Sequence, residues 1–146
     1  MRSPPAYPGH RSALRAVLLS PAAALLARVL LTSPFWINGL SKAVDFSSGA
    51  AEMEHLGFAP GALYSALTIA LHLGGAALII ARRRTALAAF ALAMFTALTI
   101  PLVHRFWAFD GLRHLIALYT AEEHVGMIGG LILVAVLDAR EHRRLR

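Results

Sequence analysis

The chain has 146 residues, of which 58% are hydrophobic and only 15% are charged, and its formal net charge is +6. This composition excludes an ordinary soluble domain and indicates one domain that lies mostly in a membrane. The sequence has no cysteine, which excludes disulfides, thiolate metal sites and a dithiol relay. Any redox chemistry would therefore belong to a bound cofactor.

The apolar residues are concentrated in four blocks of about 20 residues each, the length of helix that crosses a hydrocarbon layer roughly 30 Å thick. The blocks cover approximately residues 21–40, 61–81, 85–103 and 120–137. Because only three arginines separate the second block from the third, these two helices are expected to be antiparallel neighbours. The sequence predicts an all-α, integral membrane four-helix bundle with up-down-up-down topology.

The positions of the basic residues predict how the chain crosses the membrane. Arginines cluster before the first block, between the second and third, and after the fourth, whereas the two other connections together carry three basic residues. The positive-inside rule then predicts cytoplasmic termini and a cytoplasmic turn at residues 82–84, in a bacterial inner membrane. Residues 41–60 and 104–119 are expected outside. The basicity indicates orientation and contact with anionic lipid, and it does not indicate nucleic-acid binding.

The two ends of the chain are expected to lie outside the membrane domain. Residues 1–15 begin with a segment that is rich in proline and poor in apolar residues, which predicts a flexible cytoplasmic tail. Residues 16–139 are expected to form the four-helix domain. Residues 140–146 are expected to form a short, basic cytoplasmic tail.

The first outer connection is expected to contain a short amphipathic helix. Apolar residues such as Phe46 and Met53 are mixed there with acidic residues such as Glu52. Gly57 and Pro60 follow and are typical of a helix end. This pattern predicts a helix that lies at the membrane surface.

The second outer connection is expected to contain a similar amphipathic segment. Trp107 and Phe109 are of the residue types that anchor at the membrane interface, and Asp110 is a suitable N-cap for the helical spacing of Leu112 and Leu115. Together the two segments would roof the outer end of the bundle.

Arg28 lies about seven residues into the first block, roughly 10 Å from its cytoplasmic end. An unpaired charge at this depth costs several kcal/mol, so we expect the side chain to face the bundle. One interpretation is an arginine that snorkels to the inner headgroups or to Asp138. The other is an arginine that holds the polar head of a ligand or a partner carboxylate.

His72 lies near the middle of the second block, about 16 Å from either surface. We expect a neutral imidazole that is hydrogen-bonded to a neighbouring helix, with proton relay or ligand contact as alternatives. Depth along straight helices predicts two polar layers. The inner layer would hold His72 with Arg28 or with the hydroxyls of Thr68, Thr96 or Thr99, and the outer layer would hold Lys42, His104, Glu123 and His124.

Metal and haem sites have little support in the sequence. Four histidines are expected near the outer face, namely His55, His104, His114 and His124, but their spacing matches no common metal-binding motif. We therefore predict no metal site. A bis-histidine haem is disfavoured because His72 and His124 are expected to differ by about 10 Å in depth.

Several short motifs resemble the DoxX family of small four-helix bacterial membrane proteins. In the first block, Arg28 is followed by aromatic residues and by Gly39-x-x-Lys42. The other matching segments follow in the family's order: Leu56-Gly57-Phe58 with Pro60, His72-Leu73-Gly74-Gly75, Val103-His104-Arg105-Phe106-Trp107, and Gly129-Gly130. The resemblance covers about residues 22–137.

Two positions depart from the family pattern. His72 stands where the family commonly has glutamate, and Glu123-His124 stands where it commonly has Lys-Asn. A carboxylate and a base have exchanged places, so a polar contact between these positions could survive with its partners reversed.

The resemblance implies a membrane subunit linked to redox systems, such as the DoxD-type subunit of a thiosulfate:quinone oxidoreductase. We expect an accessory or quinone-linked subunit of a redox complex, with a polar pocket near the outer end of the bundle and a quinone as the candidate cofactor. The candidate cofactor-binding residues are Arg28, Lys42, His72, His104, Trp107, Glu123 and His124. Whether the chain is itself an enzyme stays open.

Two other functions compete with this expectation. The first is a non-catalytic interaction or assembly subunit whose polar residues only hold helices together. The second is a small transporter, which has less support because no broken pair of helices is evident in the sequence. The expected partners are the lipid bilayer and either other membrane or redox-complex subunits or a second copy of the chain.

Overall fold

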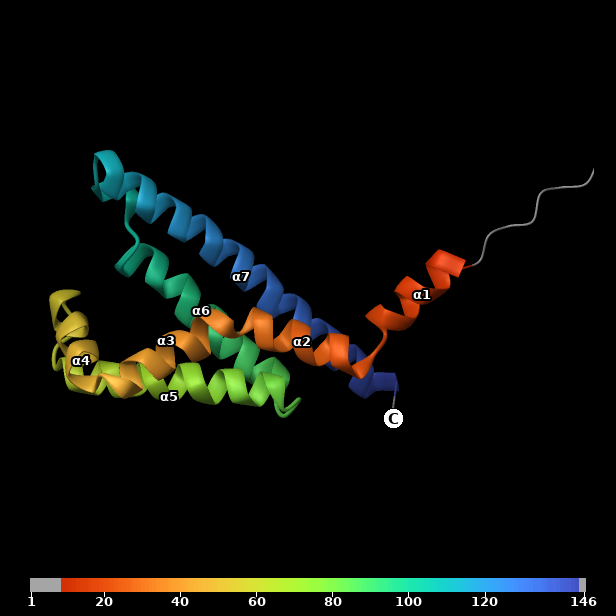
Figure 1. Cartoon of the computed structure of the whole chain (residues 1–146). Helices are drawn as coiled ribbons and strands as arrows, with labels where there is room; N and C mark the ends of the chain where they lie inside the picture. Colours follow the sequence, from red (N-terminus) through yellow and green to blue (C-terminus); the bar gives the residue numbers. More distant parts are fainter. Residues whose placement is uncertain (1–8, 145–146) are drawn as a thin grey trace, which may run out of the picture.

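The computed structural model describes residues 9–144, and every regular element in that range is helical (Figure 1). This confirms the predicted all-helical class. The elements are α1 (Gly9–Leu18), α2 (Pro21–Leu31), α3 (Ser33–Val44), α4 (Phe46–His55), α5 (Gly61–Ile80), α6 (Thr85–Leu102), the 3-10 helix η1 (Phe106–Ala108) and α7 (Gly111–Arg144).

The described residues contain three helices that are each long and apolar enough to cross a membrane, namely α5, α6 and α7. Together α2 and α3 would form a fourth span, but the two are bent by 54° relative to each other. The observed bounds of α5 and α6 agree closely with the predicted blocks. These helices indicate a multi-pass membrane protein.

The first apolar block is broken next to Pro34, although the sequence analysis predicted one continuous helix without a break. Pro34 has no N–H to donate to the carbonyl of Leu30, so the helical hydrogen bonds are interrupted there. Side chains replace the lost bonds, because the hydroxyl of Ser33 donates to the Leu30 carbonyl at 2.8 Å. The indole Nε1 of Trp36 donates to the Val29 carbonyl at 3.2 Å. Because these carbonyls keep hydrogen-bond partners within the protein, the break can lie in apolar surroundings.

The helix predicted in the first connection is present as α4, which packs on α5. Its N-cap is Asp45, whose Oδ1 accepts a hydrogen bond from the Ser48 N–H at 3.0 Å. That bond and one from Ser47 lower the pKa of Asp45. The close approach of α4 and α5 requires Gly61, because a Cβ there would lie 2.1 Å from the Ala50 carbonyl oxygen.

The second connection differs from the prediction. The expected amphipathic segment and the expected fourth membrane helix are one continuous helix, α7, which has 34 residues. Its sequence contains no proline, and the helical spacing of the apolar residues after Gly111 continues into the membrane block without an end signal. Only the short helix η1 separates α7 from α6.

The boundaries of the membrane domain stay a prediction. Residues 9–15, which belong to the expected flexible tail, form most of α1. Residues 1–8, the rest of that expected tail, lie outside the described residues. At the other end, α7 continues past the predicted domain boundary at residue 139.

The helices pack most closely toward the end that holds the turn at residues 82–84, which we call the arginine end. The core there includes Ile79 of α5, Leu92 of α6 and Leu131 of α7, all fully buried. Gly75 allows α5 to approach α6, since a Cβ at this position would lie 2.9 Å from a side-chain carbon of Leu92. Toward the opposite end, where α4 and η1 lie, α3 and α7 diverge (Figure 1).

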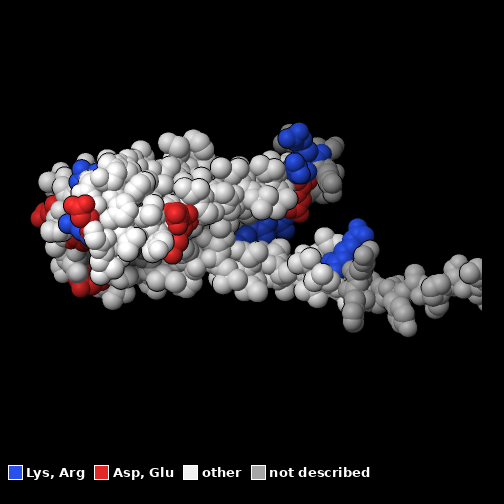
Figure 2. Space-filling model, turned by 90° about the horizontal axis from the view of Figure 1, so that it is seen from above, with Lys and Arg blue, Asp and Glu red and all other residues white. Residues whose placement is uncertain are grey.

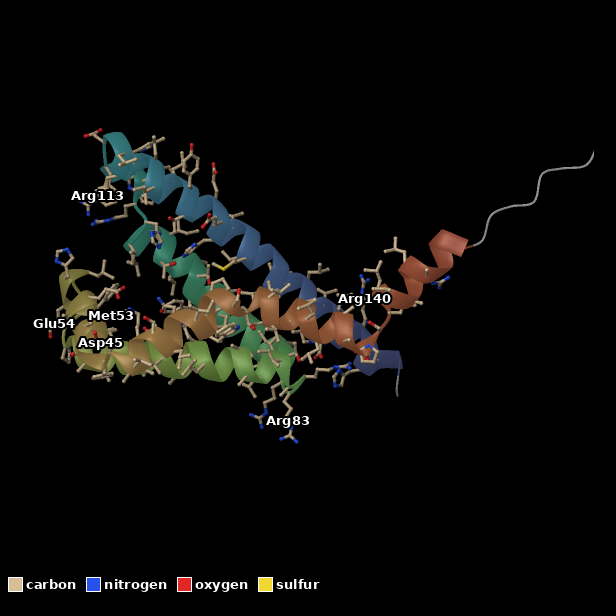
Figure 3. All side chains as sticks on the ribbon, in the orientation of Figure 1. Asp45, Met53, Glu54, Arg83, Arg113 and Arg140 are labelled. Carbon is tan, nitrogen blue, oxygen red and sulfur yellow. The ribbon has the colours of Figure 1, made fainter. Side chains whose placement is uncertain are left out.

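Charged side chains are separated along the molecule. Figure 2 shows acidic side chains mainly at one end, Lys and Arg mainly at the other, and a largely uncharged band between them. In Figure 3, Asp45 and Glu54 lie at the end formed by α4, whereas Arg83 and Arg140 lie toward the arginine end. Helices α5 and α6 contain no Asp, Glu, Lys or Arg, in agreement with such a band.

Candidate functional site

A cavity with a volume of about 460 Å³ lies between α3, α4 and α5 on one side and α6 and α7 on the other. This volume is within the usual range for small-molecule sites. Most of its lining is apolar, and Phe35, Phe95 and Met127 contribute to it. The polar side chains that line it are those of Asn38, Lys42, Glu52, Tyr64, Thr68, His72, Thr96, Thr99, His104, Thr120 and His124.

The cavity exists because α3 and α7 diverge. In the described part of the chain, no Cα of α3 lies within 8 Å of a Cα of α7. At the arginine end, by contrast, α2 does contact α7, and Leu31 packs where Gly130 leaves space for it. The helices therefore enclose a site that is closed toward the arginine end and wider toward α4 and η1.

His72 lies deep in the cavity on α5 and is only 6% exposed. Its ring meets Phe35 and Phe95 edge to face, with centroid separations of 5.3 and 4.8 Å. Neither ring nitrogen has a hydrogen-bond partner among the described residues, so the expected bond to a neighbouring helix is absent. Leaving a buried polar group unpaired costs about 1–3 kcal/mol, which makes these nitrogens the strongest indication of a ligand.

Lys42 lies near the end of α3 and is 5% exposed. Its Nζ forms an ion pair with Oε2 of Glu52 on α4, whose side chain is 55% exposed. Glu52 lines the cavity and is not among the seven candidate residues predicted from the sequence. A signal for it existed, because a lysine beside a membrane span needs a counter-ion and the predicted surface helix carries acidic residues.

His104 and His124 face each other at the mouth of the cavity, with ring centroids 4.8 Å apart. His104 follows α6, and His124 lies on α7. Nδ1 of His124 is buried and has no hydrogen-bond partner among the described residues. The structure therefore brings four of the seven candidate residues, Lys42, His72, His104 and His124, to one cavity.

This arrangement corrects the two polar layers that straight helices predict. His72 does share its surroundings with the hydroxyls of Thr68, Thr96 and Thr99, as expected. The same cavity also holds Lys42, which was expected in the outer layer. Tilt and divergence of the helices merge the two layers into one site.

Three candidate residues lie outside the cavity. Trp107 of η1 is 59% exposed, and Glu123 is an exposed residue of α7. The third, Arg28, lies at the arginine end, where its Nη1 donates to the Ala24 carbonyl at 3.2 Å.

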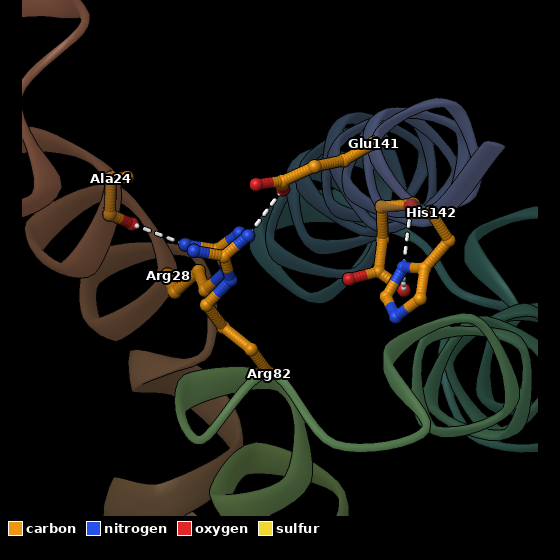
Figure 4. Close-up of polar contacts among 6 residues, drawn as sticks. Ala24, Arg28, Arg82, Glu141 and His142 are labelled. Carbon is orange, nitrogen blue, oxygen red and sulfur yellow. Dashed lines mark hydrogen bonds and ion pairs between the residues drawn. The ribbon is translucent and has the colours of Figure 1, made fainter. Parts of the chain in front are cut away.

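The surroundings of Arg28 contain an ion pair between different parts of the chain. Figure 4 shows Arg28 bonded to Ala24 on α2, and beside it Arg82, in the turn after α5, bonded to Glu141 on α7. Nη2 of Arg82 bonds Oε2 of Glu141, which joins the turn before α6 to the last turn of α7. Arg28 therefore belongs to a polar cluster that is separate from the cavity.

The described residues contain no group of three or more His, Asp or Glu side chains arranged to hold a metal ion. The cavity contains side-chain nitrogens that can donate hydrogen bonds, and these lie among aromatic and aliphatic side chains. Such a combination is suited to an organic ligand that is mostly apolar and has hydrogen-bond acceptors at its ends.

Comparison with known families gives a match to the DoxX family model over residues 23–105. The matched residues are more than half of the chain, extend from α2 through α6, and include Lys42, His72 and His104 of the cavity. No curated protein and no solved structure matches the chain. The family match agrees with the resemblance found in the motifs, and the chain belongs to the DoxX family.

Proposed function

We propose that this chain is an accessory, quinone-linked membrane subunit of a redox complex, and that the cavity binds the head group of the quinone. One observation carries the proposal: both ring nitrogens of His72 are buried and unpaired at the floor of the cavity. Membership of the DoxX family supports a membrane protein with a link to redox or quinone functions. The proposal assigns no catalytic residue.

The chemistry of the cavity suits a quinone. A quinone head is a flat, mostly apolar ring with two carbonyl oxygens on opposite sides, so it requires apolar walls and hydrogen-bond donors at two places. Phe35 and Phe95 provide aromatic walls beside His72. A neutral histidine has one N–H donor, and Lys42 has donors besides the one directed at Glu52. The imidazole ring of His124 lines the cavity from α7, across from His72 on α5.

The gap between α3 and α7 gives the isoprenoid tail of a quinone a path to the lipid. Backbone contacts between these helices are absent in the described residues. The tail would leave the cavity sideways, while the head would stay among the polar side chains. A ligand taken from the bilayer could enter without crossing either polar surface of the protein.

We infer that the chain crosses the bacterial inner membrane four times in an up-down-up-down arrangement, with α2 and α3 forming one bent span. Both termini and the turn at residues 82–84 would be cytoplasmic, and α4 and η1 would be on the outer side. The separation of basic and acidic side chains supports this orientation (Figure 2).

The test measures binding of a short-chain ubiquinone to purified protein in detergent, by equilibrium dialysis with absorbance detection. The wild-type protein should bind it, and His72→Leu should bind about 2–12-fold more weakly because one hydrogen bond is lost. His55→Leu is the matched control, because His55 is an exposed histidine of α4 outside the cavity. Equal binding by wild type and His72→Leu, or no binding by either, would contradict the proposal.

A non-catalytic interaction subunit is the second candidate, and one observation favours it. Gly126 and Gly129 are exposed on α7, and a Cβ at either position would meet nothing within 4 Å. Small residues on a membrane helix let a partner helix approach closely. If quinone does not bind, and if Gly129→Leu reduces association with another subunit or with a second copy, this function would replace the first.

A further inference from the structure

Helix α1 has an apolar face that the rest of the described chain does not cover. Leu14 and Val17 are each 61% exposed, and Leu18 is 66% exposed. Within the described residues, α1 contacts α2 and no other helix. Three large apolar side chains thus lie on a short helix with almost no protein packed around it.

The start of α2 fixes where α1 lies relative to the membrane. Ser20 caps α2 by accepting a hydrogen bond from the Ala23 N–H at 3.2 Å, and Pro21 occupies the first helical position. The chain therefore turns between the two helices, and Figure 1 shows α1 leaving α2 at a steep angle. Residues 21–44 contain about 36 Å of helix, and the bend of 54° leaves roughly 31 Å from end to end, which still matches the hydrocarbon layer of about 30 Å without α1. This places α1 at the membrane boundary, at the arginine end.

The positive charge of the N-terminal part of the chain favours binding of α1 to a negatively charged surface. The first 44 residues contain no Asp or Glu, and Asp45 is the first acidic residue. Arg2, Arg11 and Arg15 precede α2. On a helical wheel Arg15 lies about 160° from Val17, about 100° from Leu14 and about 60° from Leu18, so its charge borders the apolar face.

We propose that α1 lies on the bilayer surface and binds anionic phospholipid headgroups, with its apolar face in the lipid and with Arg15, at the edge of that face, reaching the phosphates. An amphipathic, basic helix of this kind is held by apolar burial together with attraction to negative lipid. A second copy of α1 is a poor occupant, because it carries the same positive charge. The contact would tie the N-terminal segment to the membrane beside the first span.

The absence of native cysteine allows a clean test with the full chain. Leu14→Cys places a fluorescent label on the apolar face, and Ala16→Cys places it two residues away, on nearly the opposite face. Both variants are reconstituted as single copies in nanodiscs of phosphatidylcholine, with or without phosphatidylglycerol. Quenching by iodide reports exposure of the label to water, and quenching by nitroxide lipid reports insertion.

With phosphatidylglycerol, the label at residue 14 should be quenched by nitroxide lipid and protected from iodide, whereas the label at residue 16 should be accessible to iodide. Arg15→Gln should lower the bound-to-released ratio of α1 about fivefold, the effect expected for one basic residue at an anionic surface. Arg140→Gln, on α7, is the charge-matched control and should leave this ratio unchanged. Equal iodide quenching at both positions would overturn the proposal, and so would protection that is independent of phosphatidylglycerol.

Discussion

Lys42 of α3 and Glu52 of α4 form an ion pair that connects a buried position with an exposed one. Lys42 is 5% exposed, whereas the side chain of Glu52 is 55% exposed. The carboxylate therefore compensates a buried ammonium group while it remains in contact with the surface. The pair holds α4 against the cavity that α3 helps to form.

Glu52→Gln should destabilise the protein by about 1–3 kcal/mol. The loss is smaller than for a fully buried pair, because Glu52 is half exposed, but it leaves Lys42 buried without its counter-ion. Thermal unfolding in detergent measures the effect, and adding Lys42→Met should recover most of the lost stability. Glu122→Gln, which removes an exposed carboxylate of α7, is the control.

A double-mutant cycle makes this prediction quantitative. Lys42 and Glu52 should couple by about 0.5–3 kcal/mol, as contacting residues typically do. The changes in unfolding free energy caused by substitutions at His72 and Glu123 should be additive, because Glu123 lies outside the cavity that holds His72. Coupling between His72 and Glu123, together with none between Lys42 and Glu52, would show that the cavity is assembled differently.

Two adjacent glycines of α5 should respond differently to the same substitution. Gly75→Ala should destabilise the protein by about 1–3 kcal/mol, because the new Cβ would meet the fully buried side chain of Leu92. Gly74→Ala places its Cβ in open space, so it should be neutral or stabilising by up to about 1 kcal/mol. Denaturation in detergent compares the two variants. The reverse order of stability would mean that α5 packs on α6 through another face.

Arg28→Leu should lower stability by about 1–2 kcal/mol. The substitution removes the hydrogen bond that the Arg28 guanidinium donates to the Ala24 carbonyl. Arg83→Leu, at an exposed arginine of the same end, should change stability by less than about 0.5 kcal/mol. If Arg28→Leu equals wild type in thermal stability and in partner pull-down, Arg28 is a snorkelling arginine without a structural role.

The orientation can be checked by labelling single cysteines in intact cells with a membrane-impermeant maleimide. Ser47→Cys and Ala108→Cys, at exposed positions in α4 and in η1, should react from outside. Arg83→Cys should react only after the membrane is permeabilised, because the arginine clusters predict a cytoplasmic turn. Labelling of Arg83→Cys in intact cells would reverse the assignment.

The sequence alone determined the helical class, the family and the bounds of α5 and α6. These helices are predominantly apolar runs of membrane length without Asp, Glu, Lys or Arg, bounded by Pro60, by the three arginines and by the polar segment at His104. Such runs must satisfy their backbone hydrogen bonds internally, so the local sequence is sufficient to define them. The surface helix α4 was predictable for a similar reason, since its alternating composition and its end signal are local.

The tertiary structure decided the features that depend on how helices approach one another. Pro34 is visible in the sequence, but the bend of 54° depends on Ser33 and Trp36 reaching the freed carbonyls. The grouping of His72 with Lys42 and the exclusion of Arg28 depend on the divergence of α3 and α7. Neither the grouping nor the exclusion could be predicted from the depth of each residue along a straight helix. Residues that are far apart along the chain come together only through the tilt and packing of the helices.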